Sequence, residues 1–131
     1  MKTLGILGSG DLGQQIAYYA INDGHYDSVV FFDDYTEEKE IKGFQVVGKT
    51  EDIEKMFLEK KFNELLIGIG YKHLEKRNKL YQKLSKFIPF GKIIHSSSFV
   101  DSSAEIEKGC VIYPGCIIET KVKIAANSIL N

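Results

Sequence analysis

The chain has 131 residues, enough for one domain or for one domain with an appendage. Its formal net charge is −1, so it lacks the basic excess that a nucleic-acid-binding surface needs. No apolar run approaches the length of a membrane span, and the beginning of the chain turns polar too soon for a signal peptide. Two cysteines and three histidines show no metal-ligand spacing, so neither a disulfide framework nor a metal site is predicted. We therefore expect a cytoplasmic protein.

The first third of the chain has the pattern of a nucleotide-binding βαβ unit. An apolar run at residues 3–7 predicts a buried strand, which leads into a G-x-G-x-x-G motif that begins at Gly8. Apolar residues at helical spacing follow between residues 12 and 20, and residues 28–32 predict a second strand. A strand, a glycine motif, a helix and a second strand in this order are what such a unit requires.

Residues of this unit are candidate ligand contacts. They are Gly8, Ser9, Gly10, Asp11, Asp33 and Asp34. The glycines would let the backbone approach a phosphate or a ribose, and a carboxylate after the second strand can accept hydrogen bonds from a ribose or a base. Asp11 suits a helix N-terminus but would repel a closely bound phosphate. The alternative is that the glycines serve only to pack the strand tightly against the helix.

Further strands and helices are predicted to complete a doubly wound sheet. They are a loop at 36–42, strands at 44–47, 64–69 and 90–94, and helices through 53–57 and 74–88. A second glycine pair, Gly68 and Gly70, lies at the end of a predicted strand. Neighbouring strand ends form the ligand crevice in such a sheet, so we expect both glycine segments to face one ligand. A plain strand-to-helix turn would also explain the second pair.

The last third of the chain repeats every six residues. One column of the repeat is aliphatic throughout, at Val100, Ile106, Ile112, Ile118, Ile124 and Leu130. A period of six fits neither a helix nor a hairpin, and it predicts a parallel β-helix in which this column points inward. Cys110 and Cys116 fall in a column of mostly small residues, so we expect buried free thiols. The run makes just under two coils, which predicts the front part of a longer protein or a subunit whose open end is covered.

The order of these motifs resembles the bacterial nucleotide-sugar acyltransferases typified by the bacillosamine N-acetyltransferase and the sialic-acid O-acetyltransferase. The motifs that carry the resemblance are Gly8-Ser9-Gly10, Phe32-Asp33-Asp34, Ile67-Gly68-Ile69-Gly70, His95 and Cys110-Val111-Ile112-Tyr113-Pro114-Gly115. The resemblance covers essentially the whole chain. It implies an α/β Rossmann-like domain with a parallel sheet at residues 1–95, which binds a nucleotide-sugar, with a UDP-sugar as our expectation. At residues 96–131 it implies the first coils of a left-handed parallel β-helix that forms a homotrimer and binds acetyl-CoA between subunits.

The resemblance also implies an activity, the transfer of acetyl from acetyl-CoA to an amino or hydroxyl group of a nucleotide-linked sugar in surface-polysaccharide or glycan biosynthesis. The family's catalytic histidine and most of its acetyl-CoA site would fall beyond Asn131, so we expect no catalytic residue in this chain. The acceptor half of the site carries over to the glycine loops and to Asp33 and Asp34. Asp11 and Tyr71 depart from the family pattern, which leaves the identity of the sugar nucleotide open.

The helix after Gly70 adds further candidates. Arg77 could bind a pyrophosphate through charge-assisted hydrogen bonds, although we favour a solvated helix face for it. His73 could reach a phosphate, and a surface position is the simpler interpretation. We expect His25 to lie in a solvated loop and His95 to mark the domain boundary.

Two other functions compete with the acyltransferase. An NAD-type dinucleotide-binding oxidoreductase or sensor would explain the glycine motif and Asp33, but it would not explain the hexads. A non-catalytic nucleotide-binding module that assembles through its coils would explain both parts of the sequence.

Overall fold

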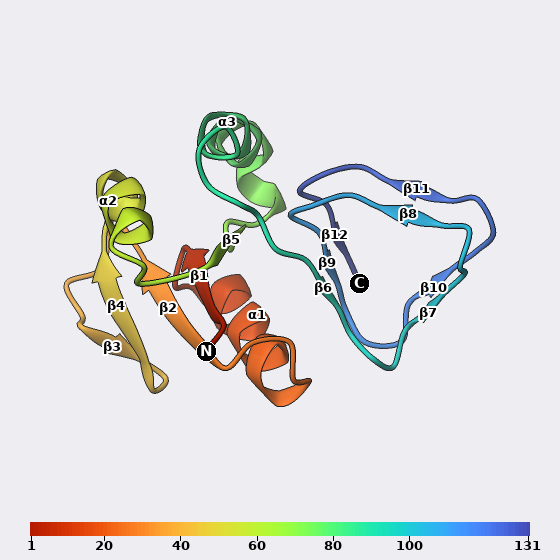
Figure 1. The fold of residues 1–131 in the computed structure, drawn as a ribbon, viewed down its shortest axis with the longest axis horizontal. Coiled ribbons are helices and arrows are strands. Elements are labelled where there is room, and N and C mark those ends of the chain that lie inside the picture. Colours follow the sequence, from red (N-terminus) through yellow and green to blue (C-terminus); the bar gives the residue numbers. More distant parts are fainter.

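The computed structural model describes residues 1–131 and has an α/β part and a triangular β-helix part (Figure 1). The α/β part contains a five-stranded sheet in the order β3-β4-β2-β1-β5. Its strands are β1 (Thr3–Leu7), β2 (Ser28–Phe32), β3 (Glu40–Ile41), β4 (Phe44–Gly48) and β5 (Glu64–Ile67). All neighbouring strands run parallel except β3 and β4. The predicted parallel α/β sheet is therefore confirmed, with one short antiparallel strand at its edge.

That edge strand corrects one expectation. Residues 36–42 were predicted to form a loop, but β3 lies within them and pairs with β4 as a hairpin. Lys42 and Gly43 form the turn with positive φ angles of 53° and 87°, a conformation that glycine adopts without strain. The high charge of the segment masked the strand, because the edge of a sheet tolerates charged side chains.

Helices cover both faces of the sheet (Figure 1). They are α1 (Asp11–Asn22), α2 (Ile53–Leu58) and α3 (Leu74–Leu84), and short 3-10 turns precede α2 at Thr50–Asp52 and α3 at Tyr71–His73. Leu4 and Ile6 of β1 pack with α1 on one face, whereas Leu7 packs with α2 and α3 residues on the other. This alternation follows from the two-residue period of a strand. None of the helices has both the length and the apolar character needed to cross a membrane.

The hexads form the β-helix as predicted. Its strands are β6 (Ile93–Ile94), β7 (Phe99–Val100), β8 (Glu105–Ile106), β9 (Val111–Ile112), β10 (Ile117–Ile118), β11 (Lys123–Ile124) and β12 (Ile129–Leu130). Each strand pairs in parallel with the strand three hexads further along, so three hexads complete one coil. Cys110 is buried, Cys116 is half-buried, and both are free thiols.

The start of the β-helix differs from the expected arrangement. Residues 90–94 were predicted to form a strand, but only Ile93 and Ile94 do so, and they pair with β9 of the β-helix. Phe90 makes a single bridge to Leu65 of the α/β sheet. A two-residue strand carries no local signal for the sheet that it joins, although Ile94 does extend the aliphatic column by one hexad. The domain division at residue 95 stays a prediction.

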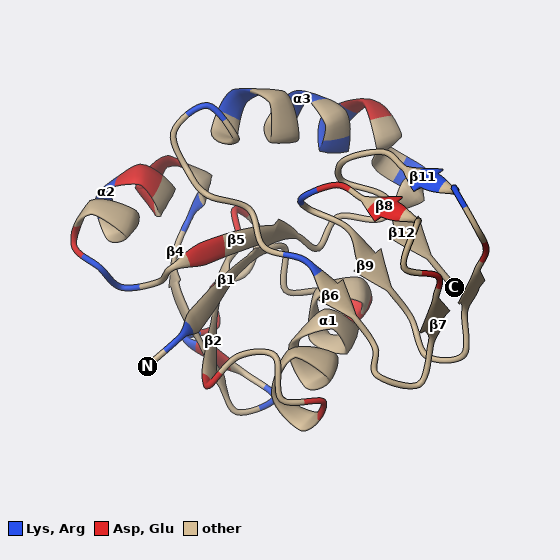
Figure 2. Cartoon of the chain, turned by 45° about the vertical axis from the view of Figure 1, so that its right-hand side comes forward, with Lys and Arg blue, Asp and Glu red and all other residues tan.

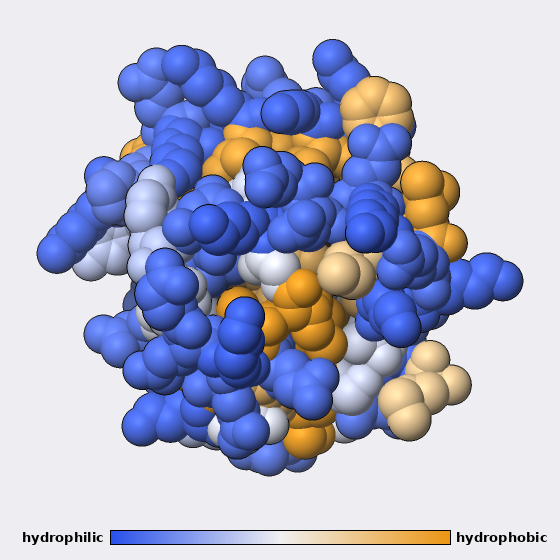
Figure 3. Space-filling view, turned by 90° about the vertical axis from the view of Figure 1, so that its left-hand side faces the viewer, coloured by the Kyte–Doolittle hydropathy of each residue, from blue (hydrophilic) through white to orange (hydrophobic).

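The two parts share one hydrophobic core. Ile93 and Val111 of the β-helix belong to the same buried cluster as Leu4, Ile16 and the other residues between α1 and the sheet. The β-helix is therefore packed directly against the α/β part. The opposite side of the molecule, over α2, β3 and β4, is mostly hydrophilic, with smaller hydrophobic areas between charged side chains (Figure 3).

Candidate functional site

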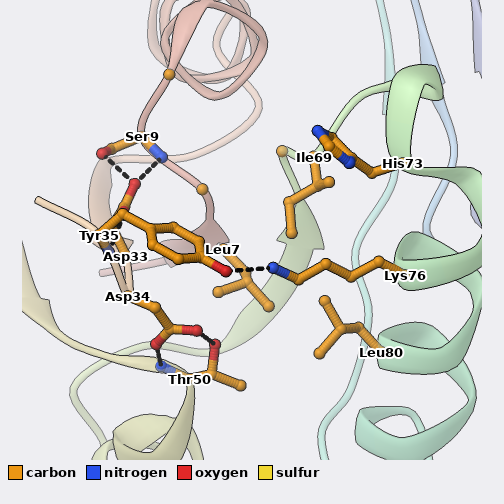
Figure 4. A pocket seen from close by; sticks show the side chains of 13 residues that line it. Leu7, Ser9, Asp33, Asp34, Tyr35, Thr50, Ile69, His73, Lys76 and Leu80 are labelled. Carbon is orange, nitrogen blue, oxygen red and sulfur yellow. Dashed lines mark hydrogen bonds between the residues drawn. The ribbon is translucent and has the colours of Figure 1, made fainter.

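The carboxyl ends of three parallel strands meet at one edge of the sheet. Gly8 follows β1, Asp33 follows β2 and Gly68 follows β5. Together they border a cavity of about 390 Å³, which we call the strand-end cavity (Figure 4). Its lining residues are Leu7, Gly8, Ser9, Gly10, Asp33, Asp34, Tyr35, Thr50, Gly68, Ile69, His73, Lys76 and Leu80. This is the crevice position at which doubly wound sheets bind ligands.

Asp33 ties the glycine loop to the segment after β2. The Ser9 backbone N–H and hydroxyl donate to Asp33 Oδ2 at 2.9 and 2.6 Å. The backbone N–H groups of Tyr35 and Thr36 donate to Asp33 Oδ1 at 2.8 and 3.3 Å. Partial burial would by itself raise the pKa of Asp33, but these hydrogen bonds outweigh burial and hold the pKa below its ordinary value. Asp33 is thus an ionised carboxylate that shapes the wall of the cavity.

Asp34 and Lys76 lie on opposite walls of the same cavity. Asp34 accepts hydrogen bonds from the backbone N–H and the hydroxyl of Thr50, both at 2.8 Å. Lys76 Nζ, on α3, donates to the Tyr35 hydroxyl at 2.8 Å and lies 4.9 Å from the centroid of the Tyr35 ring. His73 is close to Lys76 in the wall formed by α3 and the turn before it (Figure 4).

The glycine motif combines packing with an open backbone. Gly8 has a φ of 106°, and a side chain on Gly13 would overlap the Gly8 carbonyl group, so both glycines are required by the strand-to-helix turn itself. A side chain on Gly68 would press against the Gly13 backbone. Gly10 is different, because it is exposed and has no other atom near the position of a side chain. The packing alternative therefore explains Gly8, Gly13 and Gly68 but not Gly10.

The other predicted site residues do not line this cavity. Gly70, Tyr71 and Arg77 border a second cavity of about 500 Å³ between the α/β part and the β-helix, which we call the junction cavity. Leu12 of α1 and residues 126–131 complete its lining with Leu74, Asn78 and Tyr113. Asp11 is exposed at the first position of α1 and lines neither cavity. The segment from Gly68 to Tyr71 contributes to both cavities, with Gly68 and Ile69 in the strand-end cavity and Gly70 and Tyr71 in the junction cavity.

Arg77 is buried, which overturns its expected place on a solvated helix face. Only 3% of its surface is exposed. Its guanidinium donates to the carbonyl oxygens of Ile67 at 2.6 Å and Ile69 at 2.9 Å, and twice to that of Asn127 at 2.9 and 3.1 Å. Burial lowers the pKa of Arg77 to about 10, so the side chain keeps its charge at neutral pH. Arg77 thereby links the end of β5 to the β-helix.

The two remaining histidines meet at Asp23. His25 Nε2 lies 2.7 Å from Asp23 Oδ2 and is only partly exposed, so a hydrogen bond to Asp23 holds it in place and it does not lie free in a loop. His95 Nε2 lies 3.7 Å from Asp23 Oδ1, and Ser96 donates to Asp23 through its hydroxyl and its backbone N–H. The hydrogen bonds from Ser96 lower the pKa of Asp23 to about 2. This cluster fastens the end of α1 to the start of the β-helix.

Several residues of the strand-end cavity were not among the predicted site residues. They are Tyr35, Thr50, Lys76 and Leu80. Tyr35 directly follows the acidic pair, and Lys76 is one helical turn from His73, so both positions had a signal in the spacing. The contact of Thr50 with Asp34 depends on how β4 and β2 are paired, so short spacings in the sequence do not predict it.

A family model supports the interpretation of this α/β part. The model described as the PglD N-terminal domain matches residues 3–84, which include β1 to β5 and the whole of α3. The chain belongs to this family. No curated protein sequence matches the chain.

Solved structures with the same fold extend over nearly the entire chain. The acetyltransferase domain of PglB from Neisseria gonorrhoeae FA1090, in complex with acetyl coenzyme A, has a TM-score of 0.84 and 23% identity, over 99% of this chain and 62% of that domain. A mutant of perosamine N-acetyltransferase from Caulobacter crescentus, in complex with CoA and GDP-perosamine, has a TM-score of 0.80 and 20% identity, over 100% of this chain and 60% of that protein. The chain thus spans about three fifths of the length of these structures. The predicted fold class, a Rossmann-like domain followed by coils of a left-handed β-helix, is confirmed.

Proposed function

We propose that this chain provides the nucleotide-sugar site of an acetyltransferase, which transfers acetyl from acetyl-CoA to an amino or hydroxyl group of the sugar. The observation that carries the proposal is the strand-end cavity, which contains the open Gly10 backbone and the acidic pair and lies beside the junction with the β-helix. Membership of the PglD N-terminal domain family supports it. So do the bound CoA and GDP-perosamine in the Caulobacter crescentus structure, which has the same fold.

The two cavities would hold different parts of the ligand. We place the nucleotide in the strand-end cavity, against Gly8, Ser9, Gly10 and the acidic residues that follow β2. The sugar would then pass the segment from Gly68 to Tyr71 and enter the junction cavity beside β12. In this arrangement Gly70 and Tyr71 border the sugar, whereas Arg77 holds the backbone around it in place.

The residues of this chain would contribute binding and orientation. Direct attack of a sugar amine or hydroxyl on the thioester needs a base that accepts its proton. Asp33 is unsuited to that step, because four hydrogen bonds occupy its oxygens and its pKa is low. We therefore propose that the proton is accepted outside the strand-end cavity, on the β-helix side of the junction cavity. The hydrogen bonds from Arg77 to the carbonyl oxygens of Ile67 and Asn127 would then fix the distance between the nucleotide and the group that accepts the proton.

Calorimetric titration of the 131-residue chain tests this function. We expect binding of at least one of the UDP-, dTDP- and GDP-linked amino sugars, with a UDP-sugar as the first candidate, and weaker binding of NADH. Tight binding of NADH without a response to any sugar nucleotide would instead favour the dinucleotide-binding oxidoreductase or sensor. An assay of acetyl transfer from acetyl-CoA to the sugar nucleotide that binds then distinguishes an acetyltransferase from a non-catalytic binding module.

We also propose that the chain assembles into a homotrimer through the β-helix. Phe99 and Ile117 lie directly opposite each other on β7 and β10 and are 56% and 72% exposed. Paired apolar side chains that are so exposed favour a protein contact.

We expect sedimentation equilibrium to give about three times the chain mass of 14.8 kDa, and Phe99→Asp to shift the mass toward that of the single chain. Phe87→Asp is the matched control, because Phe87 is 66% exposed but lies outside the β-helix. An equal mass for all three proteins, or loss of assembly with Phe87→Asp alone, contradicts the proposal.

A further inference from the structure

The charged side chains around the strand-end cavity differ in the partners that they have within the protein. Both carboxylates are used within the protein, Asp33 by Ser9 and the following backbone, and Asp34 by Thr50. Lys76 has no carboxylate within ion-pair distance, and its hydrogen-bond partner is the neutral Tyr35 hydroxyl. Figure 2 shows that basic residues predominate along α3. Asp33 and Asp34 keep their negative charges, but their oxygens already accept hydrogen bonds within the protein. Lys76 is the one lysine or arginine in the lining, and its ammonium group is therefore available to an anionic ligand.

Lys76 and Tyr35 connect the two walls of the cavity. Tyr35 comes from the segment after β2 and Lys76 from α3, and their side chains meet across the cavity (Figure 4). The ammonium group also lies over the face of the Tyr35 ring, 4.9 Å from its centroid. Tyr35 is 81% exposed, so no packed side chains hold its ring in this position. The contact can therefore open and re-form at little energetic cost.

A phosphate is a better partner for Lys76 than a phenol. A hydrogen bond between an ammonium group and an anionic oxygen is roughly twice as strong as one between neutral groups, and the anion also neutralises the charge. The Tyr35 hydroxyl satisfies only one of the three donors of the ammonium group. A ligand with a diphosphate can thus replace Tyr35 at Lys76, and the released aromatic ring is then free to cover the nucleoside.

We propose that Lys76 and Tyr35 form a clasp that makes the strand-end cavity specific for nucleoside diphosphates, in which Lys76 binds the diphosphate and the Tyr35 ring covers the nucleoside. The proposal rests on the proposed function, because it names the residues that select the phosphorylated form of the same ligand. It assigns two separable roles. Lys76 distinguishes a nucleoside diphosphate from the nucleoside alone, whereas Tyr35 contributes to both ligands through its ring.

Titrations of the 131-residue chain with UDP, dTDP and GDP, with the corresponding nucleosides, and with pyrophosphate test the clasp. For the base that binds, we expect Lys76→Met to weaken nucleoside diphosphate binding about tenfold or more and to leave nucleoside binding unchanged. Tyr35→Ala should weaken both ligands, the nucleoside diphosphate at least as much as the nucleoside, and Tyr35→Phe should weaken neither. Lys79→Met is the matched control, because Lys79 lies on the same helix, pairs with Glu75 and does not line the cavity. Thermal unfolding of each variant shows that the fold is unchanged, as expected for exposed side chains.

Each outcome separates the clasp from the proposed function. If nucleotides bind and Lys76→Met has no effect, or weakens nucleoside and nucleoside diphosphate equally, the clasp is wrong and the nucleotide site stands. Pyrophosphate that binds as tightly as the nucleoside diphosphates also overturns the clasp, because the cavity would then be a site for free phosphate groups. If no nucleotide or nucleoside binds to the unmodified chain, the proposed function fails and the clasp fails with it.

Discussion

Replacement of Arg77 by methionine is expected to lower the free energy of unfolding by about 3 kcal/mol or more. Methionine keeps most of the length of the side chain but removes every donor. The carbonyl oxygens of Ile67, Ile69 and Asn127 would lose their hydrogen bonds from the guanidinium. A buried acceptor without a partner costs about 1–3 kcal/mol, and part of this cost is offset because the charged group no longer has to be desolvated. Urea unfolding, followed by circular dichroism, measures the change.

Two companion variants make this result specific. Lys79→Met changes an exposed residue of the same helix that pairs with Glu75, so it should alter stability by less than about 0.5 kcal/mol. Arg77→Lys should lose nearly as much stability as Arg77→Met, because a single ammonium group cannot match the planar fork that reaches three carbonyls. If Arg77→Met is as stable as the unmodified chain, desolvation of the guanidinium must cancel all of its hydrogen bonds, and Arg77 would not be the link between the two parts.

The position of Arg77 could have been predicted from helical spacing. It lies four residues before Tyr81 and seven before Leu84, and both of these side chains pack in the hydrophobic cluster beneath α3. The charge of arginine favours a solvated face, whereas its position in the helix favours the packed face. In the structure the apolar Leu74 is 57% exposed, whereas the charged Arg77 is only 3% exposed. A buried arginine is tolerated here because backbone carbonyls at the end of β5 and in the β-helix satisfy its donors, and those carbonyls come together only in the folded chain.

Features that depend on residues close together in the chain could be predicted from the sequence, whereas contacts that form only on folding could not. The strands, the glycine turn and the hexads depend on local periodicity, and β1, β2 and the β-helix strands from β7 to β12 were found at their predicted places. Contacts across the cavity depend on which strand ends are neighbours. Tyr35 and Lys76 are far apart in the chain. They meet because only β1 lies between β2 and β5 in the sheet, and α3, which follows β5, borders the same cavity as the segment after β2. Short spacings therefore predict where a cavity lies better than which side chains meet across it.

The strongest contrast within the glycine motif is expected between Gly13 and Gly10. Gly13→Ala should destabilise the fold by about 3 kcal/mol, because the added methyl group would overlap the Gly8 carbonyl group, which is backbone and cannot move aside without shifting β1 or α1. Gly10→Ala should lower the free energy of unfolding by at most about 1 kcal/mol, the cost of alanine in place of glycine at the N-cap of α1. Gly10 has a φ of −75°, which alanine adopts readily, and no other atom lies within 4 Å of the position that the methyl group would occupy.

The two variants separate the structural and the binding roles of the motif. If Gly10 lines the path of a nucleotide, Gly10→Ala should weaken binding of the sugar nucleotide at least severalfold while the unfolding midpoint in urea falls far less than with Gly13→Ala. The reason is steric, since a methyl group at an open position of the cavity wall keeps a phosphate or a ribose away from the backbone. Gly24→Ala is an unsuitable control because Gly24 has a φ of 71°, whereas Glu37→Ala lies in the segment after β2 and outside the strand-end cavity. Equal binding by Gly10→Ala, Glu37→Ala and the unmodified chain would mean that the motif serves packing alone, and the nucleotide would then have to bind elsewhere.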